Sequence, residues 1–63
     1  MNCRLKLILV ERKIKQREFA KQIGIGEAHF SRIVTGTIIP TLDIAFRIAE
    51  ALGLKVEDIW ESK

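Results

Sequence analysis

The sequence predicts an all-α fold of five short helices, and three observations support this prediction. Apolar residues recur at intervals of three and four along most of the chain, which is the period of a helix with one buried side. Four glycines and one proline divide the chain into short segments. The Ile/Thr-rich stretch 37–41 is short and contains that proline, so we expect no strand there or elsewhere.

Length and composition narrow the class of protein. The 63 residues are expected to form one small domain over 1–63, and a 48% apolar content is sufficient for a single core. Such a domain buries only about 60% of the surface that its unfolded chain exposes. A chain this short has no room for an enclosed substrate cleft of ordinary size. Cys3 is alone, so we expect no internal disulfide and a cytoplasmic location. We expect neither a signal peptide nor a membrane span.

The first two helices follow from capping and turn residues. Asn2 is a good N-cap residue for the first helix. The apolar residues of that helix are Leu5, Ile8, Leu9 and Val10. The second helix begins near Gln16, after the poor cap Lys15, and ends at Gly24, which tolerates the left-handed conformation that often follows a helix. Its apolar stripe consists of Phe19, Ala20 and Ile23.

The remaining helices are delimited in the same way. The third follows Gly26 and stops near Gly36, with an inward stripe of Phe30, Ile33 and Val34. The fourth is capped by Thr41, directly after Pro40, and ends at Gly53. Its inward residues are Ala45, Ile48, Ala49 and Leu52. A short fifth helix carries Val56, Ile59 and Trp60.

Positive charge is concentrated in the first third of the chain. Residues 1–22 contain seven Lys or Arg and two Glu, whereas residues 23–63 contain four Lys or Arg and six acidic residues. This asymmetry favours a basic surface directed at an anionic partner. A basic surface that is simply solvated explains the same composition, so the charge alone does not decide.

The second and third helices, over about 16–35, are separated only by the turn Gly24-Ile25-Gly26. A turn this short holds two helices at a steep angle, so the second projects from the body while the first supports it. Ala20 is small where the two helices are expected to approach each other. A projecting helix of this kind can enter the major groove of DNA, which is about 12 Å wide.

The segment resembles the Cro/cI-type (Xre) helix-turn-helix DNA-binding domains of phage and bacterial repressors. The resemblance runs from about Leu5 to Trp60. The matching residues are Gln16, Phe19-Ala20, Gly24, Phe30, Ile33, Gly36, Pro40 and Ala51-Leu52-Gly53. It implies a compact five-helix lambda-repressor-like domain that binds double-stranded operator DNA as a two-fold dimer. The implied function is sequence-specific regulation of transcription by a repressor.

With the apolar stripe of the third helix turned inward, its opposite side carries Glu27, Ala28, Ser31, Arg32 and Thr35. The resemblance implies base and backbone contacts at these positions. Arg32 is our first candidate for base readout by donation to guanine; a phosphate contact or an ordinary surface role is the alternative. Glu27 can accept from cytosine or serve the helix N-terminus, and we favour the second role. Ala28, next to a thymine methyl, and Ser31 complete the base-contact candidates.

Phosphate contacts are expected on both sides of this helix. The candidates are Gln16, Lys15, Arg17, Thr35 and Thr37, with Arg12 or Lys13 as further ones. Gln16 resembles the family glutamine that braces against the phosphate backbone, and the threonines can use a hydroxyl or a backbone N–H. Phosphate contacts supply affinity and register but little sequence information. His29 is expected to pack or to lie near phosphate rather than to catalyse.

Two positions depart from the family pattern. Many members pair an arginine of the first helix with a glutamate of the third, and this chain has Leu9 and Val34 instead. Replacing both partners of a buried ion pair can be neutral, so we hypothesise that Leu9 and Val34 touch in the core. Ile38 and Ile39 occupy a loop where basic residues are common. They are expected to pack under the fourth helix or to meet a partner.

Spare apolar residues predict association. They are Ile44, Phe46 and Ala51 on the fourth helix, together with Ile59 and Trp60 near the C-terminus. We expect a homodimer through the C-terminal helices, in the Ile59 and Trp60 region, although Trp60 can instead close the core. An alternative function is an antitoxin-type interaction module of a toxin–antitoxin pair that can also bind its own promoter. No catalytic pair, metal cluster or phosphate-binding glycine loop is apparent, so we expect no enzyme, metal or cofactor.

Overall fold

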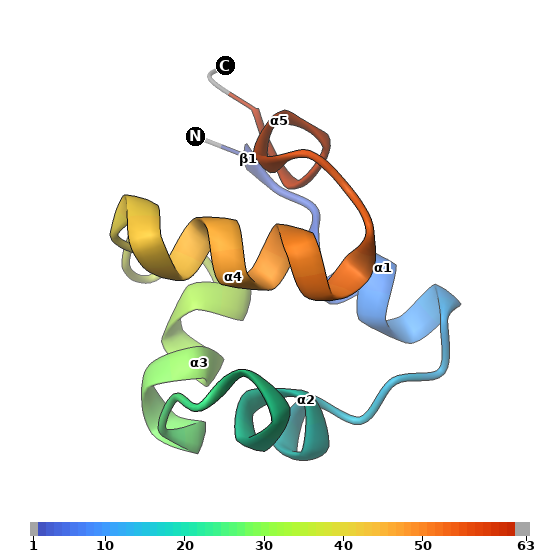
Figure 1. Cartoon of the computed structure of the whole chain (residues 1–63), viewed down its shortest axis with the longest axis vertical. Coiled ribbons are helices and arrows are strands. Elements are labelled where there is room, and N and C mark those ends of the chain that lie inside the picture. Colours follow the sequence, from blue (N-terminus) through green and yellow to red (C-terminus); the bar gives the residue numbers. More distant parts are fainter. Residues whose placement is uncertain (1, 62–63) are drawn as a thin grey trace.

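The computed structural model describes residues 2–61, and residues 1, 62 and 63 of the predicted domain lie outside this part. Five helices are present in it (Figure 1): α1 (Leu5–Glu11), α2 (Gln16–Ile23), α3 (Glu27–Val34), α4 (Leu42–Leu52) and α5 (Val56–Ile59). Two short strands, β1 (Asn2–Cys3) and β2 (Trp60–Glu61), lie near its two ends. The fold is therefore the predicted all-α domain, with one small addition.

That addition is a two-stranded antiparallel sheet, which the sequence analysis did not predict. The paired positions are Asn2 with Glu61 and Cys3 with Trp60. Arg4 reinforces the pairing, because its backbone N–H donates to the Ile59 carbonyl at 2.8 Å and its Nη2 to Glu61 Oε2 at 2.6 Å. Asn2 is therefore a strand residue, and Arg4 occupies the N-cap of α1 without a side-chain capping bond. The expected capping role of Asn2 is wrong.

The end of α2 and the starts of α4 and α5 lie where the glycine and capping residues predicted them. Gly24 ends α2 in the left-handed conformation, with φ of 78°, and a residue with a Cβ is strained there. Thr41 caps α4, its Oγ1 accepting from the Ile44 N–H at 3.4 Å. Lys55, at the start of α5, cannot accept a bond through its ammonium group. Its backbone N–H donates instead to Asp58 Oδ2 at 3.0 Å, so Asp58 supplies the missing cap.

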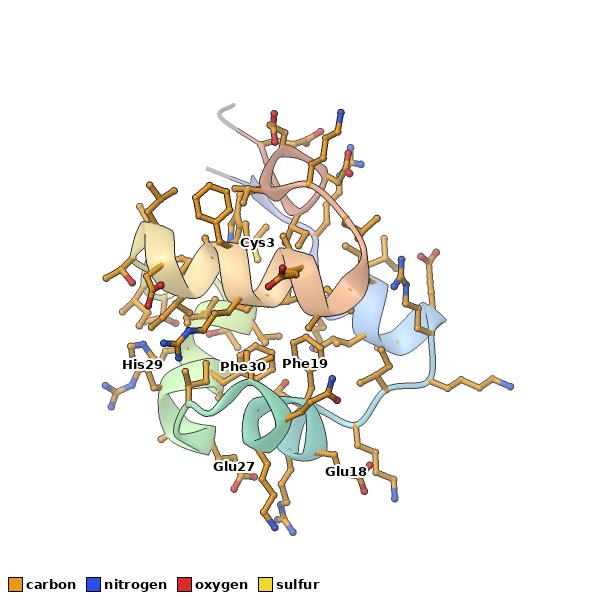
Figure 2. All side chains as sticks on the ribbon, viewed as in Figure 1. Cys3, Glu18, Phe19, Glu27, His29 and Phe30 are labelled. Carbon is orange, nitrogen blue, oxygen red and sulfur yellow. The ribbon has the colours of Figure 1, made fainter. Side chains whose placement is uncertain are left out.

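The core is formed by apolar residues from every helix and from β2. Its buried members are Leu5, Leu9, Phe19, Ala20, Phe30, Ile33, Val34, Ala45, Ile48, Ala49, Leu52, Ile59 and Trp60. Phe19 and Phe30 point into the interior between α4 and the α2–α3 pair (Figure 2), with ring centroids 5.5 Å apart. Val10 was expected in this core, but its side chain is 65% exposed. The register of α1 turns it outward.

Leu9 and Val34 are buried in the same core cluster, at 3% and 4% exposure. No charged or polar residue is buried in the described part of the chain. An apolar pair at these positions is consistent with that interior, while the direct contact between the two side chains stays a prediction.

The two ends of the described chain lie side by side at one end of the molecule, and α2 and α3 lie at the other (Figure 1). The longest helix of residues 2–61 is α4, with eleven residues. None of the described helices has the length and apolar character that crossing a membrane requires. The α2–α3 end therefore lies away from residues 2 and 61, the two ends of the described part of the chain.

Candidate functional site

Helix α3 has a fully buried side and a polar exposed side. Phe30 and Ile33 are 0% exposed, and they attach the helix to the core. On the opposite side, the exposed residues are Glu27, Ala28, Arg32 and Thr35, and Ser31 is half-buried at the boundary. The structure thus places the predicted base-contact candidates on one surface. His29 is also exposed, which excludes the packing role and leaves the position near phosphate as a prediction.

Helix α2 and the turn hold α3 in place. The Ile25 N–H donates to the Ala20 carbonyl at 3.0 Å, and the Phe30 N–H donates to the Gly26 carbonyl at 2.9 Å. Ala20 is 1% exposed, as expected for a small residue where two helices approach closely. These bonds fix the end of α2 and the start of α3, and the tilted rings of Phe19 and Phe30 join the two helices in the core, so the outer surface of α3 is presented in a defined orientation.

An ion pair joins the beginnings of α2 and α3. Arg17 Nε donates to Glu27 Oε2 at 3.1 Å, and the two side chains are 81% and 57% exposed. Exposed pairs contribute only about 0–1 kcal/mol to stability because water screens them. The other α2 candidates lie next to Arg17: Lys15 is the exposed N-cap residue, and Gln16 is half-buried in the first turn. The pairing of Arg17 with Glu27 is not apparent from the sequence.

The C-terminal end of α3 is closed by bonds to the Arg32 carbonyl. It accepts from the N–H groups of Thr37 and Ile38 at 2.9 and 3.3 Å, and from Thr35 Oγ1 at 3.3 Å. The Thr35 and Thr37 hydroxyls are 2.9 Å apart. Since the Thr35 proton is used on Arg32, Thr37 donates to Thr35. The Thr37 N–H is thus already bonded to the Arg32 carbonyl. The Thr37 hydroxyl can donate to a group outside the protein only after its bond to Thr35 is broken.

Arg12, one of the further phosphate candidates, makes a hydrogen bond within the fold. Arg12 donates from Nη1 to the Leu52 carbonyl at 2.6 Å, at the C-terminal end of α4. A cation at a helix C-terminus is favoured by the helix dipole, and the bond satisfies a carbonyl that the helix leaves free. This bond uses only one of the arginine's N–H donors, so the suggested phosphate contact of Arg12 stays a prediction. Lys13 remains exposed, with a positive φ of 57°.

The α4–α5 edge exposes three large apolar residues in addition to charged ones. Ile39, Leu42 and Phe46 are 72%, 67% and 58% exposed. They lie beside a groove of about 350 Å³ lined by Ile39, Pro40, Leu42, Ala45, Val56, Glu57 and Trp60. The two loop isoleucines thus separate, because Ile38 packs against the core and Ile39 faces solvent.

Ile59 and Trp60 belong to the core and not to an exposed surface. They are 0% and 8% exposed, so neither offers the side-chain area that a dimer contact needs. The dimer contact predicted for these two side chains is corrected accordingly. Ile59 and Trp60 were assigned to an interface because the sequence did not reveal that Trp60 pairs with Cys3 in the small sheet and that both side chains are buried in the core.

Chemistry-bearing side chains do not gather elsewhere in residues 2–61. The Cys3 thiol is half-buried and donates to the Ile33 carbonyl at 3.6 Å. Within the same residues, no group of three or more His, Cys, Asp or Glu side chains lies close enough to hold a metal ion. The α2–α3 surface is therefore the candidate site.

Comparisons with known proteins agree with this assignment. Residues 5–59 match the model of the helix-turn-helix family. Over 60 residues, or 95% of its length, the chain is 33% identical to an uncharacterized HTH-type transcriptional regulator of Methanocaldococcus jannaschii, covering 91% of that protein. It is 30% identical over 60 residues to an uncharacterized HTH-type transcriptional regulator of Archaeoglobus fulgidus, covering 84% of that protein.

Proposed function

The chain belongs to the helix-turn-helix family of DNA-binding transcriptional regulators, of the Cro/cI (Xre) type, and we propose that it is a repressor that inserts α3 into the major groove of double-stranded DNA. One observation carries the proposal: α3 is anchored by Phe30 and Ile33, both 0% exposed, while its opposite side is exposed and polar. A helix that reads base edges needs such an anchor, because its side chains must reach the bases in a fixed orientation.

Four residues are proposed to read bases. Arg32 is exposed on α3, and its guanidinium can donate two bonds to guanine, the commonest specific contact in protein–DNA recognition. Ala28 can contact a thymine methyl, and the Ser31 hydroxyl can bond to any base edge. Glu27 can accept from a cytosine amino group. Repression follows if the bound site overlaps the path of the polymerase.

Five residues are proposed to hold the phosphate backbone. Lys15, Gln16 and Arg17 lie at the start of α2, and Thr35 and Thr37 lie just after α3, so the two groups flank the reading helix on either side. The first group carries two positive charges and supplies electrostatic affinity. The hydroxyls of the second group, which bond to each other, can turn to a phosphate oxygen. These contacts set register rather than sequence preference.

The repressor is proposed to act as a homodimer in the cytoplasm, where transcription takes place. The surface that favours dimerisation is the apolar edge of Ile39 and Leu42 with the groove beside them. This edge continues from the loop that follows α3, so a two-fold axis there brings two reading helices to the same side of a duplex. Their half-sites are expected about 34 Å apart, one turn of DNA.

A second candidate function is an antitoxin-type module that binds a toxin protein. The exposed Leu42 and Phe46 side chains favour a protein partner, whether that partner is a second copy or a different chain. Purification from the native cell distinguishes the two cases. A stoichiometric second protein supports the antitoxin function, and a dimer of this chain alone supports the repressor.

The proposal is tested by selecting bound duplexes from a random DNA pool and measuring affinity against salt. We expect a near-palindromic consensus and a log–log salt slope of about −0.9 per phosphate contact. Binding that is equally strong for all sequences would contradict a sequence-specific regulator. The absence of duplex binding would contradict the use of α3 altogether.

The Arg32→Ala variant tests the assignment of base readout. It should relax preference at one base pair in each half-site, at a cost of about 1–3 kcal/mol. The matched control is Arg4→Ala, because Arg4 bonds to Glu61 and directly follows β1, which lies at the end of the molecule away from α3 (Figure 1). A consensus equally unchanged in both variants would remove Arg32 from the reading residues.

A further inference from the structure

We propose that Arg17 is a positioning residue that holds the Glu27 carboxylate where it recognises the amino group of a cytosine in the major groove. The inference rests on the proposed function, since it names one base preference and the pair of residues that produces it. It starts from the 3.1 Å bond between Arg17 Nε and Glu27 Oε2, which links the first turns of α2 and α3.

The pair is directed at the surface where DNA would lie. Glu27 points away from the body at the α2–α3 end of the molecule (Figure 2), and both side chains are more than half exposed. Neither carboxylate nor guanidinium is needed by the core, which contains no charged residue in the described part of the chain. The bond therefore orients two groups that are free to meet a ligand.

Glu27 needs a neighbouring cation if it is to enter the groove. An isolated carboxylate is repelled by the phosphates, and the arginine offsets that repulsion. When DNA covers the pair and excludes water, the attraction between the two charges grows, because the effective dielectric constant falls. A pair that contributes little in the free protein can thus be firmly held in the complex.

The bonding capacity of the two groups suits a double role. The pair uses one carboxylate oxygen, and Oε1 makes no hydrogen bond with any residue that the structure describes. Oε1 can therefore accept from cytosine N4, which is the major-groove donor of a C·G pair. Arg17 has five N–H donors in a planar fork and uses only Nε on Glu27, so its terminal nitrogens can bond to a phosphate at the same time.

Lysine cannot reproduce this arrangement. Its ammonium group is a single compact charge, whereas the arginine fork donates in two directions with fixed geometry. An Arg17→Lys variant is therefore expected to keep the phosphate contact and to lose the orientation of Glu27. This substitution separates a positioning role from simple charge.

The experiment repeats the random-pool selection with the whole chain and four variants. Glu27→Gln should abolish the cytosine preference or convert it to adenine, because a glutamine amide bonds to adenine. Arg17→Lys should weaken the preference at that base pair about fivefold or more, with an unchanged salt slope. Arg17→Ala should weaken the same preference and also reduce the slope by about 0.9. The control Glu18→Gln, an exposed acid on α2, should leave the consensus unaltered.

The outcomes distinguish this inference from the function it depends on. If the unmodified chain selects no consensus, the proposed function fails. If it selects one that Glu27→Gln does not change, or if Arg17→Lys retains the full cytosine preference, the positioning role is overturned and the regulator stands. A preference lost at the same base pair in Glu27→Gln and Arg17→Lys, with Glu18→Gln unaffected, supports the inference.

Discussion

The α2–α3 end and the α4–α5 edge of this molecule expose different kinds of surface. At the α2–α3 end, most of the exposed side chains are charged or polar. The opposite side of α3 is held in the core by residues such as Phe30, which is 0% exposed. At the second, the outward side chains of Ile39, Leu42 and Phe46 are apolar and more than half exposed. Both surfaces rest on the same core.

The difference indicates two kinds of partner. A polar surface with cations at its edge is already well hydrated, and it gains by exchanging water and counterions for a polyanion. An apolar surface gains by leaving water, so it favours another protein surface. We propose DNA as the partner of the first surface and a second copy of the chain as the partner of the other.

The largest effect is expected from a substitution in the core that holds α3, and with it the α2–α3 surface, in place. Val34→Glu places a carboxylate without a partner at a position that is 4% exposed, next to the inward residues of α3. A buried charge left unpaired costs about 3–5 kcal/mol, a large fraction of the stability of a small domain. We expect severe destabilisation or an unfolded chain, measured by circular dichroism during thermal denaturation.

The matched control for Val34→Glu is Thr35→Glu, one residue further along and exposed. It should lower the melting temperature far less than Val34→Glu, since it loses only the exposed bonds of the Thr35 hydroxyl and places a solvated carboxylate at the end of α3, while weakening DNA binding. An unchanged melting temperature in Val34→Glu would refute its contact with Leu9 in the core.

An intermediate effect is expected from removing apolar area at the second surface. Leu42→Gln should weaken dimerisation roughly ten- to a hundred-fold, because each of the two copies loses part of the 1.5–3 kcal/mol that burying a leucine contributes. The fold should be unaffected, since Leu42 is 67% exposed. Sedimentation over a range of concentrations measures the change.

Leu7→Gln is the control for Leu42→Gln, because Leu7 is also exposed, at 57%, but lies on α1. It should leave the dimer intact. Equal dimerisation in the two variants would move the interface away from the α4–α5 edge, and equal affinity for one and two half-sites would argue against a dimer on DNA.

The smallest effect is expected from a cation that belongs to neither surface. Arg12→Ala removes the 2.6 Å bond to the Leu52 carbonyl and should lower the free energy of unfolding by about 1 kcal/mol. The salt slope of DNA binding should not change, because Arg12 is engaged at the end of α4. A salt slope of DNA binding reduced by about 0.9 in Arg12→Ala would instead indicate that Arg12 contacts a phosphate.

Much of the fold was predictable because its signals are local. The start of α2 at Gln16, its end at Gly24, and the cap of α4 at Thr41 were all confirmed by the structure. The inward stripe of α3 was confirmed as well, and with it the outward surface on which the site is built. Helical spacing and glycine punctuation depend on neighbours in the chain, so they can be read without a structure.

Three of the unpredicted features join residues from different elements of the fold. The β1–β2 pairing links Cys3 to Trp60, the capping bond links Arg12 to Leu52, and the ion pair links Arg17 to Glu27. Two-residue strands have no periodicity to detect. A surface arginine has the same appearance in sequence whether it bonds to a carbonyl, a carboxylate or a phosphate.

The sequence by itself determined which side of each central helix is buried, and hence that Arg32 and its neighbours on α3 face solvent. Only the tertiary structure decided which exposed cations remain free and which apolar residues remain uncovered. The physical reason is one of range. Helix period and capping act over three or four residues, whereas the ion pair of Arg17, the bond from Arg12 to the end of α4 and the burial of Trp60 depend on partners that the fold brings from elsewhere in the chain.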